Sequence, residues 1–287
     1  MHMLLLKFYK KGQEKTKLMK AILYLLIFAM GTVFGSFCTL AIYRIPLKKN
    51  ITTERSFCPN CNHKLGFFDL IPVLSYIFLG GKCRYCGKKI KPTYLIIELF
   101  MGFSAVGIFL SSHYTFETLT IHELILFLYQ MIFATTLVLI AGIDKSKKKV
   151  SKSVIFVGCL IGFAHIIYLY VLGNTGISSI YKDVIYAAII FILAIITSKY
   201  KLFRYKYLLE ILMICIYMNM FEISEVFLIT AILTMISLTC LLIVNNYRQK
   251  IDKSDILAEE NNNLDIPIAM YLCIANIVAM VIQGILI

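Results

Sequence analysis

Long apolar runs are the feature that most constrains this chain, because roughly 20 apolar residues in a helix are enough to cross the hydrocarbon core of a bilayer. The runs lie near residues 21–43, 95–112, 122–143, 153–172, 183–198, 207–221, 224–244 and 267–287. Overall, 60% of the residues are hydrophobic and only 16% are charged, whereas soluble domains carry about a quarter charged residues. The sequence therefore predicts an all-α polytopic membrane protein with about eight transmembrane helices.

Lysine and arginine collect in alternate loops, and this indicates the orientation because basic loops stay in the cytoplasm. The basic loops are 44–94, 144–152, 198–207 and 245–255, and the loops between them together hold one lysine, Lys182. We therefore predict that residues 44–94 are cytoplasmic; the basic tail 1–20, which this arrangement places outside, does not follow the rule. The net charge of +13 is then a property of topology and lipid contact, and nucleic-acid binding is not expected.

Four of the nine cysteines are grouped in the first loop, as Cys58-x2-Cys61 and Cys83-x2-Cys86. Two CxxC turns at this spacing are typical of tetrahedral zinc sites, and a reducing cytoplasm favours a metal over disulfides. Four protein ligands leave no open coordination position, so the zinc is expected to be structural. A redox pair and unmetallated thiols are the alternatives.

The stretch FDLIPVLSYIFLGG, residues 68–81, lies between the two CxxC turns. It is too short to span a bilayer and contains Pro72, so it is predicted either to lie at the membrane interface or to pack under the cysteine module. Arg44, Lys82 and Arg84 are candidates for contacts with anionic lipid or a substrate, but most cations of the loop are expected to be determinants of topology.

The sequence GSFCTLAIYRIP (35–46), followed by CPNC, FFDLIPVLSYIFLGGKCRYC and KPTYLIIELFMG (91–102), resembles the N-terminal half of the prepilin peptidases. These are membrane aspartic endopeptidases that trim type IV prepilins and related pseudopilins. Further along, VLIAGIDKSKKKVSKS (138–153) resembles the segment that carries the first catalytic aspartate of the family, which is Asp144 here. By this resemblance, residues 95–287 are a seven-helix membrane peptidase domain.

The second family aspartate belongs to a GxGD motif, and the matching stretch here, KLFRYKYLLEILMI (201–214), lacks it. Peptide hydrolysis of this type needs two carboxyl groups that share a proton. Asp183 is predicted at the outer end of its span, so Glu210, inside the sixth span, is the expected partner of Asp144. Alternatively, Asp144 pairs with the lysines that follow it, and Glu210 pairs with a neighbouring cation.

The resemblance implies a prepilin peptidase that cleaves pilin-like precursors at the cytoplasmic face of a prokaryotic inner or cytoplasmic membrane. Methylation of the new N-terminus with S-adenosylmethionine is implied as a second activity, although no glycine-rich cofactor loop is visible. A catalytically inactive, pilin-binding assembly factor and a protein with methyltransferase activity alone are the alternatives that the missing motif leaves open.

Overall fold

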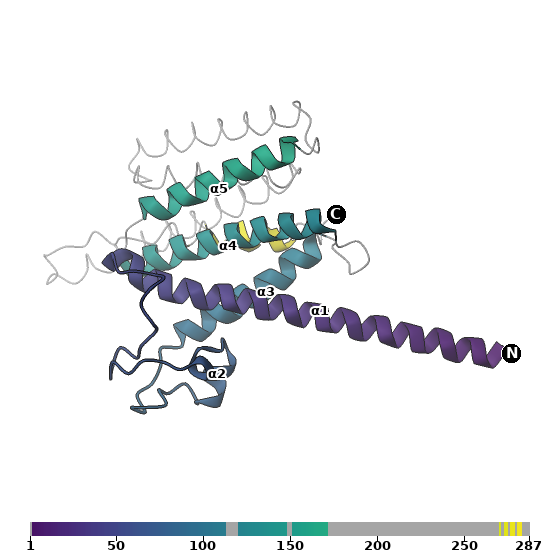
Figure 1. The fold of residues 1–287 in the computed structure, drawn as a ribbon, viewed down its shortest axis with the longest axis horizontal. Helices are drawn as coiled ribbons and strands as arrows, with labels where there is room; N and C mark the ends of the chain where they lie inside the picture. Colours follow the sequence, from purple (N-terminus) through teal and green to yellow (C-terminus); the bar gives the residue numbers. More distant parts are fainter. Residues whose placement is uncertain are drawn as a thin grey trace, which may run out of the picture. The chain divides into compact units, whose positions relative to one another are not determined.

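The computed structural model describes residues 2–112, 120–147 and 151–171 and part of 270–282. Its elements are α1 (His2–Arg44), the 3-10 helices η1 (Ile45–Leu47) and η2 (Phe67–Leu70), α2 (Leu74–Phe78), α3 (Thr93–Ser111), α4 (Ile121–Lys147) and α5 (Lys152–Val171) (Figure 1). Within these ranges the chain forms two isolated β-bridges and no β-strand. The predicted all-α class is therefore confirmed for this part of the chain.

Three of the described helices are long and apolar enough to cross a membrane: Gln13–Leu47, Thr93–Ser111 and Ile121–Lys147. They coincide with the first three predicted spans. Helix α5, Lys152–Val171, coincides with the fourth. The spans predicted at 183–198, 207–221 and 224–244 lie outside the described residues. Within the last predicted span, 267–287, the residues that the structure describes are helical.

Helix α1 is longer than the apolar run that predicted it. It begins at His2 and runs to Arg44 as one helix, so the segment predicted as a basic tail continues the membrane helix. Lysine, leucine and methionine dominate this segment, and all three have good helix propensity. Hydropathy detects the apolar part of such a helix and misses its polar extension.

Helices α1 and α3 pack closely because glycines lie where their backbones meet. A Cβ atom placed on Gly31 would lie 2.5 Å from the carbonyl oxygen of Met101, and one on Gly35 would lie 2.7 Å from the Cα atom of Glu98. A Cβ on Gly102 of α3 would lie 2.7 Å from the Phe28 ring. The Gly31-x3-Gly35 spacing is the small-residue pattern that permits close helix contact in membranes.

The chain divides into two compact units, one built mainly from residues 1–131 and the other mainly from 132–283. In the second unit, the buried positions Phe133, Leu137, Ile140 and Asp144 follow each other at helical spacing along α4. They form one face of the helix. This buried face therefore ends in a carboxylic acid.

Candidate functional site

The four cysteines of the two CxxC turns come together in the structure. The sulfur atoms of Cys58, Cys61, Cys83 and Cys86 all lie within 4.8 Å of one another, and those of Cys58 and Cys86 are 3.9 Å apart. A tetrahedral zinc ion with bonds of about 2.3 Å requires sulfur–sulfur distances of about 3.8 Å. The predicted four-sulfur cluster is therefore confirmed, and its donor set and spacing fit zinc.

The two CxxC turns have the same backbone construction. The shared hydrogen bonds are Asn62 N–H to Cys58 O (2.8 Å), Cys58 N–H to His63 O (2.9 Å), Gly87 N–H to Cys83 O (2.9 Å) and Cys83 N–H to Lys88 O (2.9 Å). The residue after the second cysteine has a positive φ in both turns, 56° at Asn62 and 68° at Gly87. Glycine and asparagine are the residues that adopt this conformation most readily. The two turns are thus a pair of matching cysteine knuckles, as their spacing predicted, and the structure adds that their backbone hydrogen bonds repeat.

The cysteine thiols differ in how readily they ionise. Burial raises the pKa of Cys58, but hydrogen bonds from the backbone of Asn60 and Cys61 outweigh it and lower the pKa to about 7. The backbone hydrogen bond from His63 lowers the pKa of Cys61, but burial and the neighbouring thiols raise it to about 11. Adjacent thiols resist joint ionisation unless a cation neutralises them, and a metal ion bound by four sulfurs supplies that charge.

Asp69 of η2 links the second knuckle to the rest of the loop. Its carboxylate accepts hydrogen bonds from Arg84 Nε (2.7 Å), the Tyr85 hydroxyl (3.1 Å) and Gly66 N–H (3.1 Å). Burial raises the pKa of Asp69, but these three donors outweigh it and hold the pKa below its usual value. The Tyr85 ring also lies against the His63 ring, with centroids 3.6 Å apart. One acid and one ring contact therefore fix the relative position of the two knuckles.

Arg44 organises the beginning of the loop. Its guanidinium is buried and donates to the backbone carbonyl groups of Asn50 (3.0 Å), Glu54 (2.9 Å) and Arg55 (3.2 Å). The expectation that Arg44 is available to lipid or substrate is wrong, because its donors serve the fold. Arg84 and Lys82 are both exposed, and Arg84 is paired with Asp69.

Glu98 of α3 joins the loop to the membrane helices. Its side chain is buried and its Oε2 accepts the Val73 N–H at 2.7 Å. Val73 has φ 62° and ψ −54°, and Leu74 N–H donates to Pro72 O at 2.6 Å. This is a γ-turn of the rare, strained kind, which is costly for a β-branched residue. The bond to Glu98 stabilises the strained turn, so this acid has a structural role.

Glu98→Ala will loosen the turn, because the Val73 N–H then loses its acceptor at a cost of about 1–3 kcal/mol. We expect backbone hydrogen exchange across residues 71–79 to accelerate by about tenfold or more, measured by mass spectrometry on protein in nanodiscs. Glu98→Gln is the matched control, since the amide oxygen can still accept the bond. Equal exchange in wild type and Glu98→Ala would show that Glu98 does not hold the turn.

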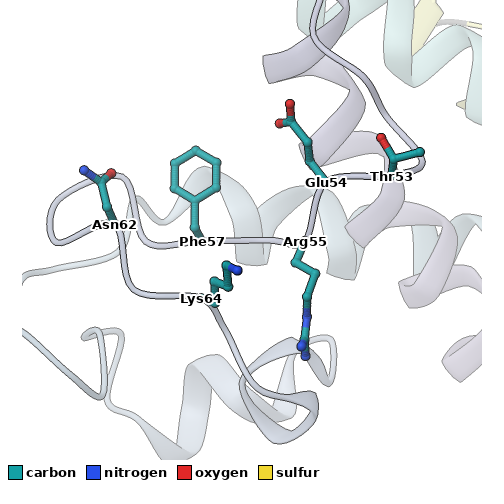
Figure 2. A pocket seen from close by; sticks show the side chains of 6 residues that line it. All are labelled: Thr53, Glu54, Arg55, Phe57, Asn62 and Lys64. Carbon is teal, nitrogen blue, oxygen red and sulfur yellow. The ribbon is translucent and has the colours of Figure 1, made fainter.

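A shallow cavity of about 500 Å³ lies beside the first knuckle (Figure 2). It is lined by Thr53, Glu54, Arg55, Phe57, Asn62 and Lys64. Every one of these side chains is exposed or partly exposed, and the charges at its rim have both signs. These features are typical of a solvated surface, so we assign no ligand to the cavity.

Asp144 lies in the last turn of α4 and its side chain is fully buried, with 0% exposure. The residues that follow it in the helix, Lys145, Ser146 and Lys147, are exposed. A carboxylic acid enclosed at the end of a membrane helix is costly and is by default a candidate functional group. Its expected partner Glu210, the excluded Asp183 and the stretch 201–214 lie outside the described residues.

Comparison with known proteins identifies the N-terminal part of the chain. Residues 29–112 match the family model of the bacterial peptidase A24 N-terminal domain. The prepilin leader peptidase/N-methyltransferase of Vibrio cholerae is 44% identical over 85 residues, which cover 26% of this chain and 34% of that protein. The protein of the same name from Bacillus subtilis is 42% identical over 85 residues, covering 29% of this chain and 34% of that protein.

A third relative of the same name, from Myxococcus xanthus, is 41% identical over 76 residues, 26% of this chain and 23% of that protein. The matches thus span about a third or less of the length of these relatives. No solved structure matches the chain. The matched family domain begins within α1, contains both cysteine knuckles and ends just after α3.

Proposed function

We propose that this chain belongs to the prepilin peptidase family, whose N-terminal domain residues 29–112 match, and that it is a membrane endopeptidase that removes the leader of pilin-like precursors. The observation that carries the proposal is the match of one continuous structural unit, from α1 through the knuckles to α3, to relatives named for this reaction. The precursor would be cut at the cytoplasmic face of a prokaryotic inner or cytoplasmic membrane, since the basic loops are predicted on that side.

Asp144 is proposed as one of two catalytic acids, with Glu210 as its partner. One carboxylate removes a proton from water while the other carboxyl group polarises the scissile carbonyl. The water oxygen then bonds to the carbonyl carbon, the C–N bond breaks, and the proton passes to the departing amine. The full burial of Asp144 at the end of α4 supports this assignment, because an ionisable residue enclosed in a membrane helix is by default a candidate functional group.

The zinc is proposed to be structural and to be held by Cys58, Cys61, Cys83 and Cys86. Four sulfur ligands fill a tetrahedral coordination sphere, so no position remains for water or substrate. The ion would supply positive charge that holds the two knuckles together, and it takes no part in hydrolysis. A loop of this size lacks a hydrophobic core of its own, so it requires a metal ion or another cross-link to fold stably.

Methylation of the new N-terminal amine is proposed as a second activity, because the relatives are also named N-methyltransferases. The methyl group would come from S-adenosylmethionine. The described residues form no enclosed cavity to which we assign this cofactor, so no residue of this chain is given a role in the transfer. A pilin-binding assembly factor without activity is the second candidate, and it is favoured by the missing aspartate in 201–214.

Purified full-length protein will shorten a pilin-like precursor from the same organism, and the mass of the product will show cleavage at one site after the leader. Addition of S-adenosylmethionine will raise the product mass by one methyl group if the second activity is present. A relative with an intact GxGD motif is the positive control for the precursor. Cleavage by that relative with none by this chain would reject the peptidase and favour the assembly factor.

A further inference from the structure

A row of large apolar side chains is exposed on the loop between the two knuckles. The exposed fractions of Phe67, Phe68 and Phe78 are 78%, 72% and 83%. The other members of the row are Leu70, Leu74 and Ile77, all more than 40% exposed. Six such groups lie within twelve residues, 67–78, and exposing this much apolar side chain to water carries a high cost. We call residues 67–78 the apolar segment.

The contacts of the apolar segment place it at the depth of the membrane helices. Val73, near its centre, bonds to Glu98, which is five residues, or about 8 Å, beyond the start of α3 at Thr93. Gly35 meets the same Glu98, and it precedes the last residue of α1 by nine residues, or about 14 Å. The chain therefore leaves α1 and then folds back, so that Val73 meets α3 at a level inside both candidate spans.

The backbone of the second half of the apolar segment is suited to an environment poor in water. Ser75, Ile77 and Leu79 donate their N–H groups to the carbonyl groups of Ile71, Val73 and Ser75, at 3.0–3.1 Å. Gly80 and Gly81 donate to Ile77 and Tyr76. Together with the bond from Val73 to Glu98, these contacts satisfy the donors that lipid cannot satisfy.

The charges beside the apolar segment identify the kind of surface that it meets. The exposed cations that follow it in sequence are Lys82, Lys88, Lys89 and Lys91, and residues 79–92 contain no acidic residue. An apolar face with lysines next to it is the pattern of segments that lie in the headgroup region of anionic membranes. A water-soluble acidic partner would match the lysines but leave the phenylalanines exposed.

We propose that the apolar segment inserts into the membrane, with the rings of Phe67, Phe68 and Phe78 among the acyl chains and the flanking lysines at anionic headgroups. The zinc knuckles are then held against the membrane surface by two attachments, the bond to Glu98 and the inserted rings. This arrangement does not depend on proteolysis, so it holds for the peptidase and for an inactive assembly factor alike.

The chain contains no tryptophan, so a single introduced tryptophan reports on its own surroundings. Phe68→Trp and Phe78→Trp are placed in nanodiscs that contain anionic lipid with brominated acyl chains, which quench tryptophan on contact. Glu54→Trp is the matched control, because Glu54 is an exposed side chain of the same loop outside the apolar segment. Bound zinc is measured in each variant to verify that the knuckles are intact.

We expect each of the two segment tryptophans to lose more than about half of its emission in brominated lipid, while the control loses little. Emission from positions 68 and 78 that is quenched by aqueous iodide and not by bromine would overturn the proposal. A shift of the emission to shorter wavelength that occurs only when a pilin-like precursor is added would also overturn the proposal, and it would assign the surface to the substrate.

Discussion

Asp144→Asn will abolish cleavage of a pilin-like precursor, lowering the rate by about a thousandfold or more, as is usual when a catalytic group is removed. Asparagine has nearly the same shape as aspartate, so it preserves the buried face of α4 that Asp144 completes. It cannot remove a proton from water or share one with a second acid. The rate is measured from the mass of the product over time, and helix content is compared by circular dichroism.

Glu123→Gln is the matched control for Asp144→Asn, because it makes the same acid-to-amide change in the first turn of the same helix. Glu123 Oε2 accepts the Thr120 N–H at 2.7 Å, and the Thr120 hydroxyl accepts the Glu123 N–H at 3.3 Å. Glutamine preserves this capping box, so cleavage should be unchanged. Full activity in Asp144→Asn would exclude Asp144 from the chemistry.

Glu210→Gln tests whether Glu210 is the catalytic partner of Asp144 or only pairs with a neighbouring cation. Loss of cleavage with intact, folded protein would support the proposed pair of Asp144 and Glu210. Unchanged cleavage would exclude Glu210 and direct the search to another carboxyl group, because one acid alone cannot fill both roles.

The helices that length and apolarity could predict are those found. Helix α3 was predicted at 95–112 and lies at Thr93–Ser111, and α4 was predicted at 122–143 and lies at Ile121–Lys147. The hydrocarbon core sets a minimum length for each apolar run, so this signal is contained in the local sequence. The close packing of α1 on α3 also had a local signal, the glycines at 31 and 35, but their spacing was not used in the prediction.

The candidate site was predictable only where its residues share a motif. The four cysteines could be grouped from their spacing, because two CxxC turns supply the four ligands of a tetrahedral zinc site. The bonds of Asp69 to Arg84 and of Glu98 to Val73 join residues 15 and 25 positions apart, and no local pattern specifies them. The charge of Arg44 suggested a residue at the surface. Its guanidinium carries five N–H donors, however, so it can bind several backbone carbonyl groups at once when it is buried.

Cys83→Ser will release the metal and unfold the loop between α1 and α3 while the membrane helices remain. Structural zinc sites stabilise small domains by about 10–16 kcal/mol in peptides, which is more than the hydrogen bonds of a loop of this size can replace. Wild type should hold one zinc per chain by elemental analysis, and the variant none. Trypsin should then cut the variant rapidly at the exposed lysines between 82 and 91.

Cys159→Ser is the control for Cys83→Ser, because Cys159 is a partly exposed cysteine of α5 outside the four-sulfur cluster. It should retain both the metal and the resistance to trypsin. Removing the metal from wild type with a chelator should reproduce the trypsin pattern of Cys83→Ser, and lowering the pH should do the same because protons compete with the metal for the sulfurs. A loop that resists trypsin equally without metal would show that Asp69, Arg44 and Glu98 hold it unaided. In that case the four thiols would not be needed for structural zinc, and a redox pair would become the favoured alternative.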